Sequence, residues 1–127
     1  MSEPTQFQQD LALRFKDKYN FVFSNHVLII DVKETLEVMK ALKDEFGFNM
    51  LLDVCGVDNL KRPKSEWKHG KRFESVYHLL NMDKHERIRV RIPVDVIGGE
   101  KVPSVMPFWK GADWFEREAW DMFGIEY

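Results

Sequence analysis

Apolar residues along the chain follow a helical period in some segments and an extended period in others. Phe7, Leu11 and Phe15 recur four residues apart, which predicts one buried side of a helix over residues 5–18. Thr5 suits its N-terminal cap, because a threonine oxygen can accept a hydrogen bond from the free N–H groups of a first helical turn. The first predicted element is therefore an amphipathic helix.

A second helical segment lies between residues that typically start and end helices. Asp31 with Glu34 three positions later has the spacing of a capping box, and Gly47 can adopt the left-handed conformation that ends a helix. Four residues are predicted to line its buried side: Leu36, Met39, Leu42 and Phe46.

The remaining apolar runs are short and predict strands. Residues 86–94 alternate most cleanly, with one apolar face and one face that carries Arg87, Arg89 and Arg91. The other predicted strands are residues 21–23 and 26–30 around a turn at Ser24-Asn25, then 48–54, and then 73–82, which a hairpin at residues 83–85 joins to 86–94. A polar, basic loop is expected over residues 58–72.

A third helix is predicted over Asp113–Phe123, with Asp113 as its cap, Glu116 as the capping partner and Gly124 as the C-terminal stop. At about 100° per residue, its buried side is expected to comprise Met122, Phe115, Ala119, Phe123 and Trp120. Its outer side is expected to carry Trp114, Arg117, Glu118 and Asp121, with Arg117 paired to Asp113 and Asp121. Trp114 and Glu118 then have no local role, and an exposed tryptophan beside a spare carboxylate indicates a contact with a partner.

These elements follow the order α-β-β-α-β-β-β-α. That order predicts an α+β fold, a two-layer sandwich with the helices on one face of a mostly antiparallel or mixed sheet. A chain of 127 residues suits one compact domain, so residues 1–127 are predicted to form a single domain.

Composition excludes several classes of protein. With 44% hydrophobic and 31% charged residues, the chain is too apolar for a disordered tail. It has no uncharged apolar run of the length that a membrane-spanning helix needs. The N-terminal residues lack the basic and apolar parts of a signal peptide, so we expect a cytoplasmic protein.

The charge distribution is uneven. Residues 61–91 carry 10 basic and 4 acidic side chains, a local charge of +6 between two acidic segments. This pattern suits docking against charged partners, and it leaves open a stand-alone module that binds nucleic acid or another anion through Lys68, Lys71 and Arg72. The pI of about 6.1 and the lack of an aromatic stacking platform argue against nucleic acid.

Few residues are candidates for chemistry. The chain has no GxGxxG motif, and its four histidines lack zinc-site spacing. His78 is interpreted as a satisfied core or interface histidine, and Cys55, the single cysteine, as a residue buried at a strand end. No catalytic, cofactor-binding or metal-binding residue is predicted. Arg87, Arg89 and Arg91 form either an exposed strand face or a docking face for an acidic partner.

The last helix carries the most specific sequence pattern. Residues 109–125 read WKGADWFEREAWDMFGI, which resembles the signature of the C subunit of proton-pumping NADH:quinone oxidoreductase (respiratory complex I), the 30-kDa subunit of mitochondria. The signature positions are met by Trp114, Glu116, Arg117, Glu118, Asp121, Met122, Phe123, Gly124 and Ile125. Residues 53–58, 72–79 and 102–105 resemble further segments of the family, so the likeness covers roughly residues 20–127.

Two features depart from the family pattern. Phe115 stands where a small residue or proline is common, and the sequence ends at Tyr127, before the family's C-terminal tail. The resemblance implies a cofactor-free subunit of the peripheral arm. It also implies packing against the D subunit, the homologue of hydrogenase large subunits, with the B and I subunits among the other partners. NADH, flavin, iron–sulfur clusters and quinone would then be held by those partner subunits.

The resemblance also implies a location on the cytoplasmic side of the inner membrane, or on the matrix side in mitochondria. An equivalent subunit of an energy-converting membrane-bound hydrogenase carries the same motif, so the motif does not separate the two complexes.

Overall fold

A computed structural model describes residues 5–22, 25–63, 65, 67 and 69–127. The described elements follow in the order α1 (Gln6–Phe15), η1 (Lys16–Lys18), β1 (Tyr19–Val22), β2 (Asn25–Ile29), η2 (Val32–Glu34), α2 (Thr35–Asp44), β3 (Met50–Asp58), β4 (Phe73–Asn81), β5 (Glu86–Val94) and α3 (Ala112–Phe123), where η marks a 3₁₀ helix. The predicted order of helices and strands is confirmed, and no described helix has both the length and the apolar character needed to cross a membrane.

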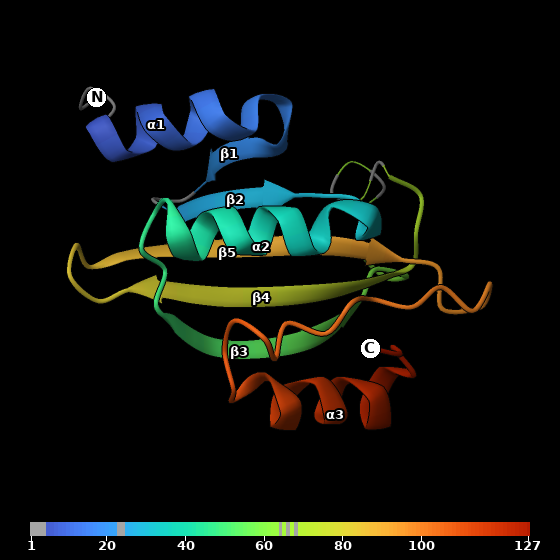
Figure 1. The fold of residues 1–127 in the computed structure, drawn as a ribbon. Coiled ribbons are helices and arrows are strands. Elements are labelled where there is room, and N and C mark those ends of the chain that lie inside the picture. The colour runs from blue at the N-terminus through green and yellow to red at the C-terminus, as the bar shows by residue number, and fades with distance from the viewer. Residues whose placement is uncertain (1–4, 23–24, 64, 66, 68) are drawn as a thin grey trace.

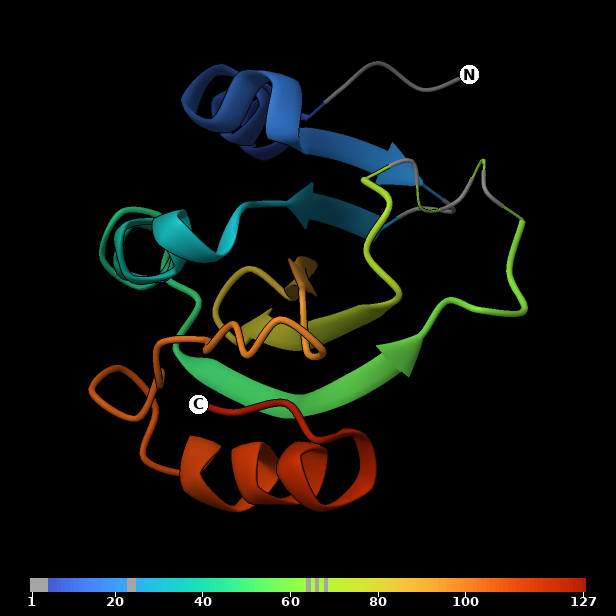
Figure 2. The same cartoon turned by 90° about the vertical axis from the view of Figure 1, so that its right-hand side faces the viewer.

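The described strands form one mixed sheet in the order β1-β2-β5-β4-β3. β2 and β5 run parallel, and the other neighbours are antiparallel. The three described α-helices cover the same face, with α1 and α2 over the β1–β2–β5 side and α3 beside β3 (Figures 1 and 2). The predicted two-layer α+β sandwich is therefore confirmed.

The core lies between the helices and one face of the sheet. β5 contributes Ile88, Val90 and Ile92, all buried, as the alternation of the sequence predicted. Facing them, Met39 and Leu42 of α2 are fully buried. Burial of one such side chain stabilises a fold by about 1.5–3 kcal/mol. The apolar face of β5 thus sets which side of the sheet the helices cover.

Both predicted capping boxes form, but the one at Asp31 caps the 3₁₀ helix η2, and α2 itself starts only at Thr35. Thr5 and Gln8 form a reciprocal capping box, with N···O distances of 3.1 and 2.7 Å. The backbone N–H of Asp31 donates to Glu34 at 3.1 Å, while the Asp31 carboxylate accepts from the Lys33 N–H at 2.9 Å. The first helix is shorter than predicted, because it ends at Phe15 and continues as η1.

The prediction for the buried side of α2 was wrong at Leu36, which is 47% exposed. The buried arc is centred on Val38 and Leu42, and it also takes in Thr35, Met39 and Ala41. At about 100° per residue, Leu36 falls roughly 60° beyond Met39 on the solvent side. Gly47 has a φ of +72°, which fits its predicted place after the helix.

β3 starts and ends later than predicted. Phe48 is buried but precedes the strand, which spans Met50–Asp58. Cys55 therefore lies inside β3 rather than at its end, and its side chain is exposed rather than buried. Because side chains alternate along a strand, the burial of Val54 on the helix side places Cys55 on the opposite face. The predicted turn at Ser24-Asn25 lies partly outside the described residues, and Asn25 belongs to β2.

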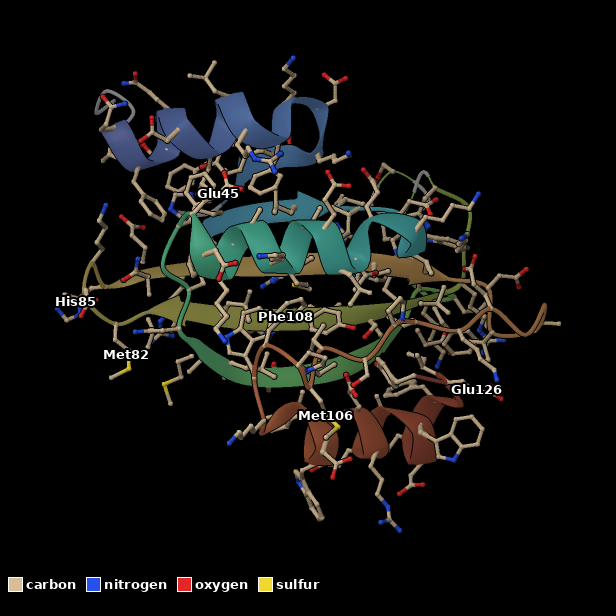
Figure 3. The ribbon with its side chains drawn as sticks, in the orientation of Figure 1. Glu45, Met82, His85, Met106, Phe108 and Glu126 are labelled. Atoms are coloured by element: carbon tan, nitrogen blue, oxygen red, sulfur yellow. The ribbon has the colours of Figure 1, made fainter. Side chains whose placement is uncertain are left out.

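The segment between β5 and α3 fills the helix layer. Val102, Val105 and Trp109 are buried there, and the Trp109 indole N–H donates to the Phe48 carbonyl at 3.1 Å. Lys43 of α2 donates to the carbonyl of Phe108 at 2.7 Å, and Figure 3 shows Phe108 between α2 and α3. This packing fixes the position from which α3 begins.

Candidate partner-binding face

α3 is held close to β3 by small residues at the contact. Ala112 and Ala119 are buried on its inner side, and Phe123 packs over Gly56 of β3. A Cβ atom at Gly56 would lie 2.3 Å from Phe123 Cδ2, so only glycine fits beneath that ring. Figure 2 shows α3 running alongside β3 with the C-terminal segment between them. The sequence therefore seats α3 rigidly on the edge of the sheet.

Glu116 has a different role from the predicted one. The helix starts at Ala112 with Gly111 as its cap residue, and neither Asp113 nor any other described side chain caps it. At about 100° per residue, Glu116 lies between Phe123 and Trp120 on the helix surface, so it points inward, where it is only 6% exposed. Its carboxylate accepts from the Ser104 hydroxyl at 2.7 Å and from the Val105 N–H at 2.9 Å. Glu116 therefore fixes α3 to the preceding segment.

The buried side of α3 has the predicted centre but is narrower than predicted. Phe115 and Phe123 are partly buried, whereas Trp120 is 47% exposed and Met122 is 72% exposed. The buried arc is centred on Ala112 and Ala119. At about 100° per residue, Trp120 and Met122 lie at its two margins. Both were expected to be buried, and the structure instead adds them to the outer surface.

The outward side of α3 combines apolar and charged groups. Trp114 is 66% exposed, and Arg117, Glu118 and Asp121 are exposed along the same side. Arg117 was expected to pair with Asp113 and Asp121, but the described residues contain no ion pair between them. The C-terminal stop is as predicted, since Gly124 has a φ of +73° and donates to the Trp120 carbonyl at 2.8 Å. We call the exposed side chains Trp114, Arg117, Glu118, Trp120, Asp121 and Met122 the α3 face.

A hollow of about 590 Å³ adjoins the α3 face. Figure 3 shows two of its lining residues, Met106 and Glu126, along the edge of α3. Trp120, Arg117 and Tyr127 line it as well, so apolar and charged groups meet in one concave surface. Such a surface can receive a side chain of a protein partner.

The row of arginines on β5 is divided by the structure. Arg87 and Arg89 are exposed and line a hollow of about 350 Å³ on the face of the sheet away from the helices. Arg91 instead binds the fully buried Glu74 of β4 through two parallel bonds, Nε–Oε1 at 2.7 Å and Nη2–Oε2 at 2.8 Å. Of these three described arginines, only Arg87 and Arg89 therefore expose their guanidinium groups to solvent.

Sequence reasoning missed the role of Glu74. Its carboxylate also accepts from Asn59 at 2.7 Å and lies 2.9 Å from His69 Nε2. Burial by itself raises the pKa of Glu74, but the hydrogen bonds from Arg91, Asn59 and His69 outweigh it and lower the pKa to about 2. The available signal was a lone acidic residue in an apolar strand that a short hairpin joins to the arginine-bearing strand.

This pKa predicts acid sensitivity. A glutamate has an unfolded-state pKa of about 4.3. Because the folded-state value is lower, the ionised Glu74 stabilises the fold above pH 4.3, and this contribution is lost as the pH falls toward 2. We expect the free energy of unfolding to drop by about 3 kcal/mol over that window. Urea titrations from pH 6 to pH 2 measure it, and Glu74→Gln should flatten the curve; an equally steep curve for that variant would contradict the assignment.

Several basic side chains of residues 61–91 form ion pairs within the domain. Arg72 binds Asp58 through two bonds of 2.8 Å, and Lys71 binds Glu100 at 2.9 Å. The bonds from Arg72 and from the Leu60 N–H lower the pKa of Asp58 to about 2. Lys68 lies outside the described residues. These internal pairs leave the anion-binding alternative with few free cations from the residues that suggested it.

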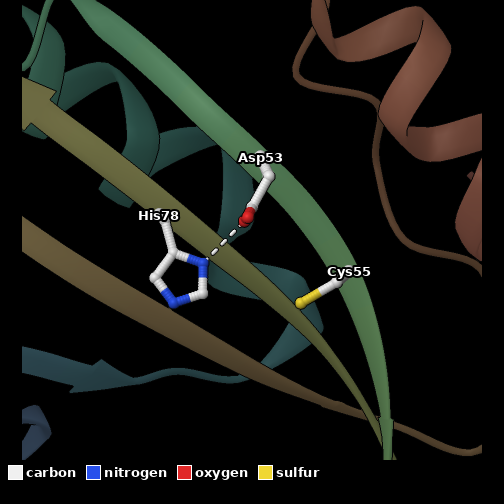
Figure 4. Close-up of side chains that lie close together, drawn as sticks. All are labelled: Asp53, Cys55 and His78. Atoms are coloured by element: carbon white, nitrogen blue, oxygen red, sulfur yellow. Dashed lines mark hydrogen bonds and ion pairs between the residues drawn. The ribbon is translucent and has the colours of Figure 1, made fainter.

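One group of side chains on the outer face of the sheet could hold a metal. His78 Nδ1 lies 2.6 Å from Asp53 Oδ1, and the donor atoms of Asp53, Cys55 and His78 lie within 4.8 Å of one another (Figure 4). His78 is half-exposed rather than part of the core. The sequence showed no zinc-site spacing because His78 comes from a different strand, and only the strand register places it beside Asp53.

Comparison with known proteins identifies relatives over most of the chain. Residues 28–127 match the model of the family described as respiratory-chain NADH dehydrogenase, 30 Kd subunit. The C subunit of NADH-quinone oxidoreductase from Phenylobacterium zucineum is 39% identical over 107 residues, which cover 84% of this chain and 47% of the relative. The same subunit from Dechloromonas aromatica is 44% identical over 92 residues, 71% of this chain and 45% of the relative. The chain thus spans about half the length of the curated relatives it matches.

Solved structures share the fold. A trypsin-resistant fragment (1–134) of Nqo5 superposes with a TM-score of 0.83 at 27% identity, covering 96% of both chains. A chain of the membrane-bound sulfane sulfur reductase, an archaeal respiratory membrane complex, gives 0.69 at 20% identity, covering 92% of this chain and 66% of that one, which shows the fold alone. The resemblance of residues 109–125 is confirmed, and the chain belongs to the 30-kDa subunit family of respiratory-chain NADH dehydrogenase.

Proposed function

We propose that this chain is a structural and assembly subunit of the peripheral arm of a proton-pumping NADH:quinone oxidoreductase. It supports electron transfer from NADH to quinone without performing the chemistry, and it holds no flavin, nicotinamide or iron–sulfur cluster. Residues 1–127 act as one domain in this role. The observation that carries the proposal is the α3 face on a helix that Glu116 and Gly56 hold rigidly.

The composition of the α3 face supports a protein partner. Trp114, Trp120 and Met122 expose large apolar surfaces on a helix of 12 residues. Exposed tryptophans at this density are costly to leave in water and are favoured at the centres of protein interfaces. Arg117 and Glu118 supply opposite charges between them, which can set the orientation of the partner.

We assign the D subunit, the homologue of hydrogenase large subunits, as the chief partner, with the B and I subunits nearby in the same arm. The relatives are named as subunits of NADH-quinone oxidoreductase, which supports a place in that complex. NADH, flavin, iron–sulfur clusters and quinone belong to the partner subunits in this proposal. The domain then lies on the cytoplasmic side of the inner membrane, or on the matrix side in a mitochondrion. Arg87 and Arg89 form a second contact surface on the opposite face of the sheet.

Substitutions on the α3 face test this proposal. We expect Trp114→Ala combined with Arg117→Ala to lower the recovery of the D and B subunits with the tagged chain at least about tenfold, since truncating hot-spot side chains costs about 1–4 kcal/mol each. The measurement is a pull-down from native membranes with quantitative mass spectrometry. The free energy of unfolding should change by less than about 0.5 kcal/mol, because these side chains are exposed.

Leu13→Ala is the matched control, because Leu13 is 72% exposed on α1, away from the α3 face. It should leave the recovery of both partner subunits unchanged. Full assembly of the α3 variant would refute the assignment of this face, and equal loss in the Leu13 variant would show that exposed apolar residues act without specificity.

A further inference from the structure

Asp53, Cys55 and His78 converge on the face of the sheet opposite the helices. Asp53 and Cys55 are two residues apart on β3, so both side chains project from the same face. His78 of β4 is the direct cross-strand neighbour of Asp53. Figure 4 shows the Asp53 carboxylate and the Cys55 sulfur both on the Nδ1 side of the His78 ring. The strand register alone therefore brings a carboxylate, a thiol and an imidazole together.

The distances between the donor atoms fit a small cation. All three donors lie within 4.8 Å of one another, and the His78–Asp53 pair is at 2.6 Å. A tetrahedral zinc with bonds of about 2.0–2.3 Å keeps its ligand atoms about 3.3–3.8 Å apart. Asp53 and Cys55 each have only one or two side-chain torsions, so a small rotation brings the donors to that separation. We propose that Asp53, Cys55 and His78 form a three-ligand site for Zn²⁺, with its fourth position open to water or to a group from a partner.

The charges around the site select the type of metal. Two anionic ligands, the Asp53 carboxylate and the Cys55 thiolate, balance a divalent cation. The guanidinium of Arg89 acts on Cys55 from β5, across the intervening strand β4, and Arg87 lines the adjoining hollow with Asp53 and His78. These positive charges disfavour cations that bind by electrostatics alone, such as Mg²⁺ and Ca²⁺. Zn²⁺ gains additional bonding from the soft thiolate, so the site favours it.

Binding of Zn²⁺ at this site should release a measurable proton from the Cys55 thiol. A cysteine thiol has an ordinary pKa of about 8.5. The metal-free thiol is therefore protonated at neutral pH. Zn²⁺ forms the Zn–S bond with the thiolate, and the thiol proton passes to the buffer. About one proton per bound metal follows from this step, and no electron is transferred.

The test uses the metal-free, reduced 127-residue chain and adds Co²⁺ as a spectroscopic probe for Zn²⁺. We expect one Co²⁺ per chain with a thiolate-to-cobalt charge-transfer band in the near ultraviolet and the strong visible bands of tetrahedral cobalt. Zn²⁺ should displace it, while Mg²⁺ and Ca²⁺ should not. Calorimetry in buffers of different ionisation enthalpy should give about one proton released per Zn²⁺.

Two variants remove ligands, and a third is the matched control. Cys55→Ser should abolish the charge-transfer band, and His78→Gln should weaken Zn²⁺ binding by at least about 100-fold. His85→Asn changes an exposed histidine in the β4–β5 turn, at a φ of +54° that asparagine tolerates, and should bind Zn²⁺ as the parent does. Circular dichroism checks that each variant folds. A parent chain without the band, or a Cys55→Ser chain with parental Zn²⁺ affinity, would overturn the site.

Discussion

Replacing Arg91 with alanine is expected to destabilise the domain by about 3–5 kcal/mol, a large part of the stability of a domain of this size. The reason is that Glu74 would remain buried without its two-bond partner, and among the described residues Asn59 and His69 would be left in contact with its carboxylate. Equilibrium urea unfolding followed by circular dichroism measures the loss, as a lower midpoint with an unchanged slope.

An arginine on the same face of the same strand, four residues earlier, is the control. Arg87 shares the sheet face of Arg91 but is exposed, so Arg87→Ala should change the free energy of unfolding by less than about 0.5 kcal/mol. Adding Glu74→Leu to an Arg91→Leu chain should recover much of the loss, because removing both members of a buried pair leaves no unpaired charge. A loss of equal size from Arg87→Ala would mean that the buried carboxylate is not the cause.

Replacing Gly56 with valine is expected to displace α3 from β3 and to destabilise the domain by about 1–3 kcal/mol. The first carbon of the new side chain would lie 2.3 Å from Phe123 Cδ2 and 2.6 Å from its Cγ, so the ring cannot keep its place. Because the α3 face depends on that seating, recovery of partner subunits should fall together with stability. The measurements are the urea midpoint and the rate of limited proteolysis within α3.

A second glycine provides the comparison for this substitution. Gly111 has a φ of −67°, and a Cβ atom there would meet nothing within 4 Å, so Gly111→Ala should leave the midpoint unchanged or slightly raised. Phe123→Ala should remove most of the extra cost of Gly56→Ala, giving a coupling energy in a double-mutant cycle. Additive effects of Gly56→Ala and Phe123→Ala would show that the two residues do not meet.

The candidate sites differ in how far they could be predicted. The signature residues 114–124 were predicted to lie on a helix with an outer face around Trp114, and the helix and that exposure are confirmed. The buried anchor Glu116 was assigned to a cap because it stands three residues after Asp113, although helical spacing places it between Phe123 and Trp120 on the predicted buried side. The roles of Glu74 and His78 were missed because both depend on side chains of neighbouring strands.

The sequence by itself determined the order of the elements, the capping boxes at Thr5 and Asp31, the apolar face of β5 and the family. Those features depend on residues close together in the chain, whose spacing records the helical or extended period. Only the tertiary structure decided which strands are neighbours, and with that which charges meet. Arg91 contacts Glu74, and His78 lies beside Asp53 and Cys55, because β4 lies between β5 and β3 in the sheet. Long-range packing sets the register of these three strands.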